Sequence, residues 1–209
     1  NFYFVLAENT AWANAGTLLA HEQIELTRHV PAEPVTVTEK INIKRSLKKS
    51  GNIWHLLCGD TGFVISEDGS VKELRQNEKT VLPEAFNPNF FRAGTDNDGV
   101  RGWTGQENKP LGKWLAAGLD QIKPELCSIF ADAENFTLTC KYACKGTTDT
   151  LYFIQQITAR QDGTFVFSQE YHIPESFPSM PRIGVLAMTT PGFGDFEYFG
   201  RGPWENYID

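Results

Sequence analysis

The stretch that decides the fold runs from residue 52 to residue 74 and reads NIWHLLCGDTGFVISEDGSVKEL. Its apolar residues predict strands over 52–58, 61–66 and 71–74, because short apolar runs bounded by turn residues are typical of strands. The Asp-Gly pair at 68–69 is the strongest local hairpin signal in the chain. Three short strands joined by tight turns predict an antiparallel sheet.

The same pattern continues on the C-terminal side of this stretch. Further strands are predicted over residues 124–131, 135–143, 150–160, 164–173, 182–189 and 195–199, with a second Asp-Gly hairpin signature at 162–163. One helix is predicted over 110–119, where Pro110 suits the first turn. About ten strands and one short helix predict an all-β fold, a large antiparallel β-sandwich.

The N-terminal part reads as a separate unit. Residues 2–6 alternate as a strand would, and residues 17–26 hold a second alternating run. Residues 30–39 contain two prolines and no periodic apolar face, which is typical of a linker. We therefore expect residues 1–45 to be the last strands of a preceding domain plus a linker, and residues 46–209 to form the main sandwich. Since both ends fall inside patterned segments, we expect the chain to be a part of a longer protein.

Composition excludes several classes of partner. The net charge is −7, so a nucleic-acid partner is not expected, and the one basic cluster, at residues 44–49, is better explained as a solvated strand edge or linker. No apolar run has the length of a membrane span, and no signal peptide is recognisable, so no membrane partner is expected. The four cysteines, Cys58, Cys127, Cys140 and Cys144, lack zinc-ligand spacing and are expected to be free thiols. Free thiols favour a cytoplasmic location, with the bacterial periplasm left open.

The first group of residues that could carry chemistry lies between residues 89 and 103, NFFRAGTDNDGVRGW. Carboxylates, amides and arginines bind hydroxyl groups, and an aromatic face packs on the C–H groups of a sugar. These residue types make six positions candidates for carbohydrate binding: Arg92, Asp96, Asn97, Asp98, Arg101 and Trp103. The alternatives are a turn or helix cap and half of a calcium loop without its distal glutamate.

Two carboxylates within three residues should not both stay unpaired in a pocket. Arg92 is the nearest cation along the chain, so we expect it to pair with one of Asp96 and Asp98. An extended chain would hold residues 92 and 96 about 13 Å apart. We therefore expect a turn at Gly94, which leaves the other polar groups to face a sugar cleft.

The second group lies in residues 198–207, YFGRGPWENY. Its two glycines and one proline favour a rigid, sharply turned loop. Arg201, Glu205 and Asn206 are the candidate binding residues there, beside Trp204. A structural turn in which the arginine caps carbonyl groups is the alternative.

Other signatures of catalysis are missing from the sequence. There is no nucleophile elbow, zinc-protease motif, phosphate loop or dinucleotide fingerprint, and we expect neither a metal nor a cofactor in this chain. The one nearby acid–base pair is His172 with Glu170 or Glu175, which an aldose epimerase would require. An aldose epimerase is therefore an alternative function.

Three ordered motifs resemble the C-terminal part of the β-galactosidases of glycoside hydrolase family 2. They are Phe90-Phe-Arg-Ala-Gly-Thr-Asp-Asn-Asp98, Pro181-Arg-Ile-Gly184 and Gly200-Arg-Gly-Pro-Trp-Glu-Asn-Tyr207. The opening also resembles that family, since residues 10–16 and 21–23 look like the end of the immunoglobulin-like domain that precedes the sandwich. The resemblance covers essentially the whole chain.

The resemblance implies a galactose-mutarotase-like supersandwich preceded by the last strands of an immunoglobulin-like sandwich. It implies a parent enzyme that hydrolyses terminal β-galactosides by a retaining mechanism, with both catalytic glutamates on an upstream α/β barrel. No catalytic residue of this chain is then expected, and the isolated chain should be inactive. The implied partners are a β-galactoside, the upstream barrel of the same chain and further copies in a homo-oligomer. The alternative from another class is a non-catalytic carbohydrate-binding or assembly module.

Overall fold

The computed structural model describes residues 2–22, 43–100 and 106–195. The chain divides into two compact units, Asn1–Glu39 and Lys40–Asp209. The proline-containing linker predicted at 30–39 lies outside the described residues, and the assignment of residues 1–45 to an immunoglobulin-like sandwich stays a prediction.

The N-terminal unit contains one antiparallel hairpin. Strand β1 (Phe2–Val5) pairs with β2 (Leu18–Glu22), and Tyr3 faces His21 across the pair, with their rings stacked at 6.4 Å. Six apolar side chains are about half exposed or more, namely Phe2, Tyr3, Phe4, Val5, Leu18 and Leu19. A two-stranded ribbon has no core of its own, so this hairpin leaves apolar surface uncovered on both faces.

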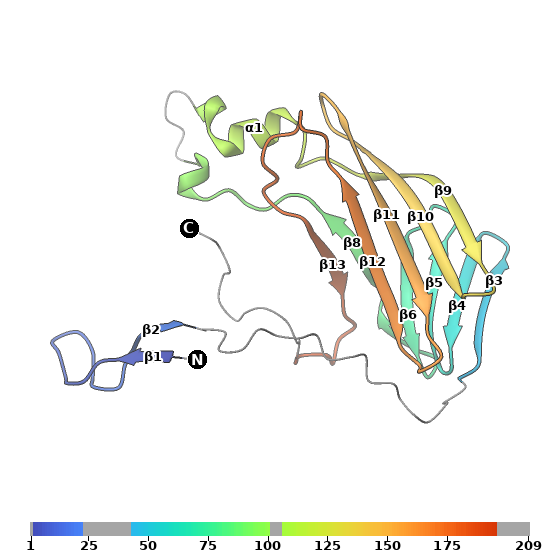
Figure 1. The fold of residues 1–209 in the computed structure, drawn as a ribbon, viewed down its shortest axis with the longest axis horizontal. Coiled ribbons are helices and arrows are strands. Elements are labelled where there is room, and N and C mark those ends of the chain that lie inside the picture. Colours follow the sequence, from blue (N-terminus) through green and yellow to red (C-terminus); the bar gives the residue numbers. More distant parts are fainter. Residues whose placement is uncertain (1, 23–42, 101–105, 196–209) are drawn as a thin grey trace. The chain divides into compact units, whose positions relative to one another are not determined.

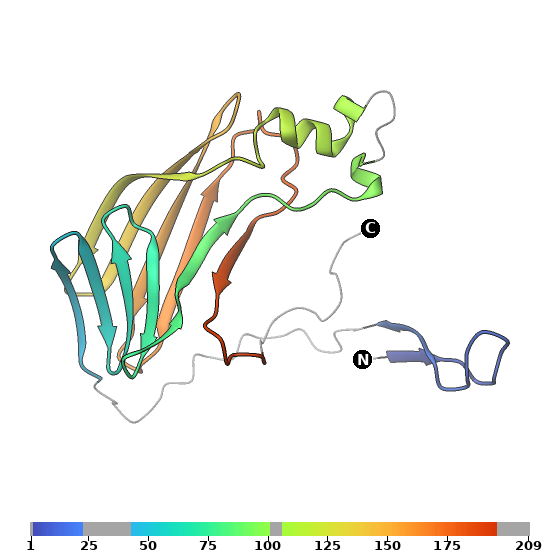
Figure 2. The same ribbon diagram turned by 180° about the vertical axis from the view of Figure 1, so that it is seen from behind.

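The second unit contains two larger antiparallel sheets and a two-stranded one (Figures 1 and 2). The first sheet has the order β3-β4-β5-β6-β7, and the second has the order β12-β11-β10-β9. The third pairs β13 with β8. The bounds are β3 Arg45–Ser50, β4 Ile53–Cys58, β5 Thr61–Ser66, β6 Val71–Gln76, β7 Lys79–Leu82, β8 Glu84–Asn89, β9 Pro124–Asp132, β10 Thr137–Lys145, β11 Thr150–Ala159, β12 Phe165–His172 and β13 Gly184–Met188.

The two large sheets pack face to face around one core. In β4 and β11 alternate side chains are buried, as the two-residue period of a strand requires. Phe63 of β5 meets Phe165 of β12 edge to face at 5.0 Å, and the Tyr142 hydroxyl of β10 donates to the Gly69 carbonyl in the β5–β6 turn at 2.8 Å. These contacts confirm the predicted all-β sandwich.

Three strands were not predicted. Strand β3 carries the basic cluster, and its Arg45 is half-buried and donates to the Ala159 carbonyl at 3.1 Å. This arginine therefore joins the two sheets, whereas Lys44, Lys48 and Lys49 are exposed along this edge strand, in agreement with the predicted solvated strand edge. Strands β7 and β8 are short, and Phe86 within β8 has φ 60°. A phenylalanine in that left-handed region belongs to a bulge, which breaks the alternation that predicts strands.

The helical segments are short. Helix α1 covers Pro110–Ala116, three residues shorter than predicted, and two 3₁₀ helices cover Asp96–Asp98 and Gln106–Asn108. Trp114 and Leu119 are buried on the side that faces the sandwich core. Among the described residues, no helix is long and apolar enough to cross a membrane. The predicted strand at 195–199 lies almost wholly outside them.

Candidate functional site

The candidate segment begins after β8 and ends in a short 3₁₀ helix. Thr95 is extended, residues 96–98 form one helical turn, and Gly99 ends the turn with φ 103°. The N–H of Asp98 donates to the Thr95 carbonyl at 3.0 Å, and the N–H of Gly99 donates to the Asp96 carbonyl at 3.1 Å. The carboxylate of Asp98 turns back and accepts from the Thr95 N–H at 2.8 Å and from its hydroxyl at 2.9 Å.

An ion pair holds this turn against the segment that connects it to β8. Arg92 Nη1 lies 2.6 Å from Asp98 Oδ2, and Nη2 lies 3.3 Å from Oδ1. The expected pairing of Arg92 with one aspartate is thus confirmed, and Asp98 is the partner. A two-pronged arginine–carboxylate contact fixes direction as well as distance. We call Arg92, Thr95 and Asp98 the brace.

The brace is anchored to helix α1. The Arg92 guanidinium lies over the Trp114 ring, 5.0 Å from its centroid. The Trp114 indole N–H donates to the Ser179 carbonyl at 2.8 Å, which fixes the ring. Trp114 is buried, so the guanidinium stacks on an immobile aromatic face.

The environment of Asp98 favours its charged form. The hydrogen bond from Arg92 is the largest cause, followed on the same side by the two bonds from Thr95, and together they lower the pKa of Asp98 to about 2 despite its burial. Asp98 is therefore ionised under physiological conditions.

The expected turn at Gly94 was placed too early in the chain. The backbone reverses at Asp96–Gly99, and Gly94 is required for a different reason. A Cβ at residue 94 would lie 3.0 Å from Leu111 Cδ2 and 3.1 Å from Val100 Cγ2, so the glycine permits close packing against the start of α1.

The candidate residues take different positions in the structure. Asp98 is buried and Arg92 is half-buried, while Asp96 and Asn97 are exposed on the outer side of the turn. The structure therefore brings Arg92 and Asp98 together and presents Asp96 and Asn97 to solvent. The other five candidates, Arg101, Trp103, Arg201, Glu205 and Asn206, lie outside the described residues.

Trp114 and Ser179 are functional neighbours that sequence reasoning missed. Trp114 lies within the helix predicted over 110–119, but the helical pattern does not show what its side chain contacts. Ser179 is 65 residues further along the chain, and no local signal links the two.

The alternative acid–base pair forms but lacks a cleft. His172 Nε2 lies 3.2 Å from Glu170 Oε1, with side-chain exposures of 57% and 69%. Both side chains stand on the outer face of the sheet, where water surrounds them, so they have neither the enclosure nor the facing groups that an epimerase site requires. This arrangement does not support the aldose epimerase function.

The cysteines are free thiols, as expected. Cys58, Cys140 and Cys144 are buried and Cys127 is exposed. Burial raises the pKa of the Cys144 thiol to about 12, so this group is an inert part of the core. Within the described ranges, no group of three or more His, Cys, Asp or Glu side chains could hold a metal ion.

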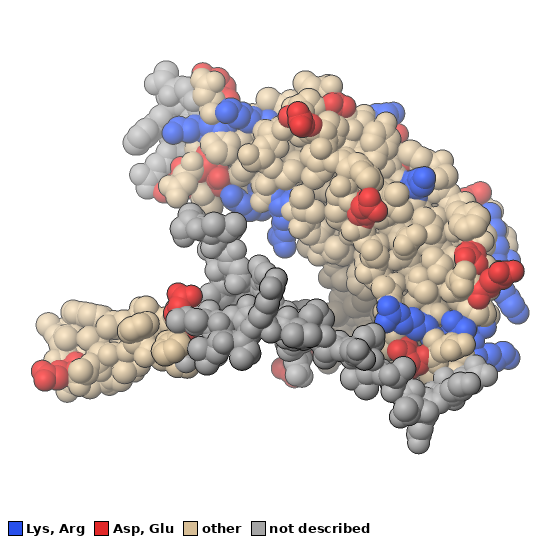
Figure 3. All heavy atoms as spheres, in the orientation of Figure 1, with Lys and Arg blue, Asp and Glu red and all other residues tan. Residues whose placement is uncertain are grey.

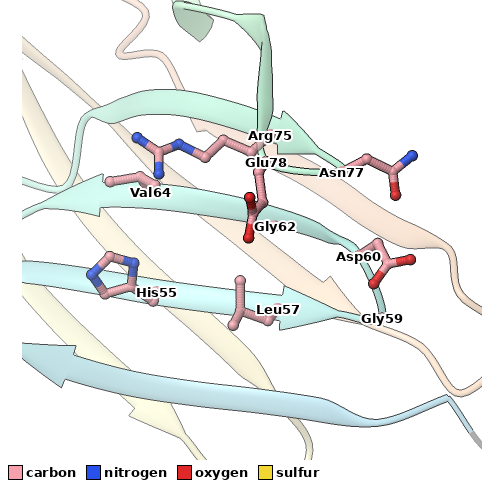
Figure 4. A pocket seen from close by; sticks show the side chains of 9 residues that line it. All are labelled: His55, Leu57, Gly59, Asp60, Gly62, Val64, Arg75, Asn77 and Glu78. Atoms are coloured by element: carbon pink, nitrogen blue, oxygen red, sulfur yellow. The ribbon is translucent and has the colours of Figure 1, made fainter.

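A hollow on the outer face of the first sheet was not foreseen either. It measures about 580 Å³ and is lined by His55, Leu57, Gly59, Asp60, Gly62, Val64, Arg75, Asn77 and Glu78 (Figure 4). The polar ends of Arg75, Glu78 and His55 lie around the apolar side chains of Leu57 and Val64, and Asp60 and Asn77 lie at one end of the hollow. The sequence held one signal: the residue after Asn77, where a hairpin turn favours glycine, is a glutamate.

Charge elsewhere on this unit is mixed in sign. On the face shown in Figure 3, basic and acidic side chains alternate over the surface and no broad region of one sign stands out. Such a surface has no preference for a polyanion.

The fold and the candidate site define the chain as an all-β sandwich that carries a braced polar turn next to helix α1. Comparison with known proteins then identifies the family. The family model described as "Beta galactosidase small chain" matches residues 60–209, and the chain belongs to this family.

Individual relatives agree with this assignment. The chain is 29% identical to the β-galactosidase of Priestia megaterium over 98% of its own length and 19% of that protein. It is 24% identical to the β-galactosidase of Vibrio cholerae, covering all of this chain and 21% of the relative. It is 28% identical to the β-galactosidase of Clostridium acetobutylicum, over 98% of this chain and 22% of the relative. The chain therefore spans about a fifth of the length of the relatives it matches.

Proposed function

We propose that this chain is the accessory sandwich of a longer retaining β-galactosidase, and that the turn at residues 96–98 helps to form the wall of its sugar site. The family match supports the enzyme class. The braced turn supports the site, because it fixes two exposed polar side chains, Asp96 and Asn97, on a rigid support.

Rigid support matters for binding a sugar. A hydroxyl group is recognised by donors and acceptors that are already in place, since ordering a mobile loop would cost binding free energy. The brace supplies that order. Arg92 pairs with the Asp98 carboxylate and lies over the ring of Trp114, which is fixed by its hydrogen bond to the Ser179 carbonyl. Asp98 and Arg92 are then positioning residues, and the exposed Asp96 and Asn97 are the groups proposed to contact a hydroxyl.

Hydrolysis itself requires two catalytic carboxyl groups, and neither is proposed to lie in this chain. A retaining glycosidase uses two carboxyl groups about 5–5.5 Å apart, one as acid/base and one as nucleophile. In the proposed parent these belong to the upstream barrel. Two carboxylates with lowered pKa values, those of Asp68 and Asp98, are each held in a local turn by neighbouring hydrogen bonds.

A second role in assembly has its own support. Apolar side chains are exposed on the hairpin β1–β2, and Val185, Leu186 and Met188 are exposed on β13. Contiguous apolar surface of this kind marks places where another protein surface packs. We propose that both regions are covered by other parts of the parent chain or by further copies in a homo-oligomer.

The isolated 209-residue chain is expected to have no activity on a chromogenic β-galactoside. Without the two carboxylates, neither protonation of the leaving group nor formation of the glycosyl-enzyme can occur. The measurement is release of the chromophore by fractions of the purified chain from a sizing column. Activity that co-elutes with the chain would contradict the proposal that both catalytic carboxylates lie on the upstream barrel.

A further inference from the structure

We infer that the hollow on the outer face of the β3–β7 sheet is a binding site for a neutral, polyhydroxylated ligand such as a hexose unit. This second site goes beyond the proposed function. It rests on three observations: the shape of the hollow, the chemistry of its lining and the unfavourable backbone of Glu78.

Gly62 lies at the centre of an outward-facing row that lines the hollow. Leu57 of β4 pairs with Gly62 of β5, and Gly62 pairs with Arg75 of β6. A Cβ at residue 62 would collide with the Leu57 side chain and lie 3.2 Å from the Leu56 carbonyl oxygen. The missing side chain at residue 62 therefore makes room for the Leu57 side chain, which lies over Gly62 and forms part of the floor of the hollow. A volume of about 580 Å³ is in the range of small-molecule sites.

The lining combines an apolar floor with unpaired polar groups. Leu57 and Val64 present C–H surface, on which the C–H groups of a sugar ring can pack. The side chains of His55, Asp60, Asn77 and Glu78 have no hydrogen-bond partner within residues 43–100 and 106–195. Together they offer both donors and acceptors, which is what hydroxyl groups need.

The charges around the hollow exclude an anionic ligand. Its one guanidinium, that of Arg75, is already paired with Glu73 at 2.6 Å. The two carboxylates of Asp60 and Glu78 remain, so a phosphate or carboxylate would meet net repulsion. A neutral ligand that donates hydrogen bonds to both carboxylates fits this arrangement.

The backbone conformation of Glu78, at the rim of the hollow, indicates a role for its side chain. Gln76 pairs with Lys79, so Asn77 and Glu78 form a two-residue hairpin loop, with φ 49° and 64°. This is the geometry of a type I′ turn, in which Asn-Gly is the preferred pair. Glutamate is strained there, whereas glycine is not. A strained residue whose carboxylate lines a hollow is typical of a functional position.

The test is a titration of the ¹⁵N-labelled 209-residue chain with lactose, followed by backbone amide shifts. We expect saturable shifts at Leu57, Gly62 and Glu78, with a dissociation constant on the order of millimolar. Glycerol at the same concentration should give only small shifts that are linear in concentration, and inorganic phosphate should give no saturable shift at these amides.

Glu78→Gly and Asn77→Gly distinguish binding from folding, because the turn geometry favours glycine at both positions. Glu78→Gly should raise the melting temperature by about 2–4 °C and weaken lactose binding at least about fivefold. Asn77→Gly should also fold and should weaken binding. Glu134→Gln, in the β9–β10 turn, is the control and should bind like the original chain.

The inference would be overturned by the absence of a saturable shift with lactose, by saturable shifts with phosphate in its place, or by unchanged lactose binding in Glu78→Gly. Saturable shifts confined to residues 95–98 would also overturn it, and would instead place the sugar at the braced turn. No hydrolysis is measured, so the outcome is independent of the proposed enzymatic role.

Discussion

Replacing Phe153 with alanine should lower the free energy of unfolding by about 3–5 kcal/mol. Phe153 lies on β11, an inner strand of its sheet, and is 1% exposed. Its ring stacks on Tyr142 at 4.5 Å and contacts Tyr171 at 5.5 Å and Phe90 at 6.4 Å. Truncation removes a buried ring and leaves a cavity among three aromatic side chains that cannot all move to fill it.

Urea unfolding of the purified chain measures this loss. The midpoint should fall while the slope with urea concentration stays the same. Phe130→Ala is the matched control, since Phe130 lies on β9 of the same sheet and is 66% exposed. It should cost less than about 0.5 kcal/mol. Equal losses for the two variants would show that the core is not where the structure places it.

Replacing Arg92 with alanine should lower the free energy of unfolding by about 2–3 kcal/mol. Removal of one partner from a buried pair costs about 3–5 kcal/mol, but the Arg92 side chain is 35% exposed and Asp98 keeps its two bonds from Thr95. The loss should therefore fall below that range. Lys145→Ala is the control, because Lys145 and Glu125 form an exposed pair, with side-chain exposures of 68% and 65%. It should cost less than about 1 kcal/mol.

The difference in the free energy of unfolding between the original chain and Arg92→Ala should depend on pH. The folded pKa of Asp98, about 2, is lower than its ordinary value of 3.8. Its contribution to stability is therefore present above about pH 4 and is lost as the pH falls from about 4 towards 2. The variant lacks the main cause of the lowered pKa, so the two free energies of unfolding should converge at low pH. A difference that stays constant between pH 5 and pH 2.5 would refute the role of the ion pair.

The sequence predicted those elements whose signals are local. The Asp-Gly turns at 68–69 and 162–163 predicted two hairpins, and alternation predicted β10, β11 and β12. The bulged strand β8 was missed because Phe86 interrupts the alternation. Strand β3 was not predicted because its basic residues fit a solvated strand edge and a linker equally well. It is the edge strand of its sheet, and no local signal indicated that Arg45 contacts the second sheet.

The candidate site was predictable to a similar degree. The pairing of Arg92 with an aspartate followed from charge and distance along the chain. Which aspartate it chooses depends on Thr95, and what holds the arginine depends on Trp114 and Ser179. These contacts are tertiary, so a pattern in one sequence cannot specify them. The hollow around Gly62 likewise depends on the register of three strands.

The most direct test of the proposed function compares Asn97→Ala with Arg92→Ala in the longer β-galactosidase. Asn97 is exposed and outside the brace, so its loss should leave the melting temperature within about 1–2 °C. If Asn97 contacts the sugar, kcat/KM for a chromogenic β-galactoside should fall about tenfold or more. Arg92→Ala should lower both quantities, because the turn loses its support. A normal kcat/KM for Asn97→Ala, together with normal kinetics for the folded fraction of Arg92→Ala, would contradict the proposal and leave residues 96–98 as a structural turn.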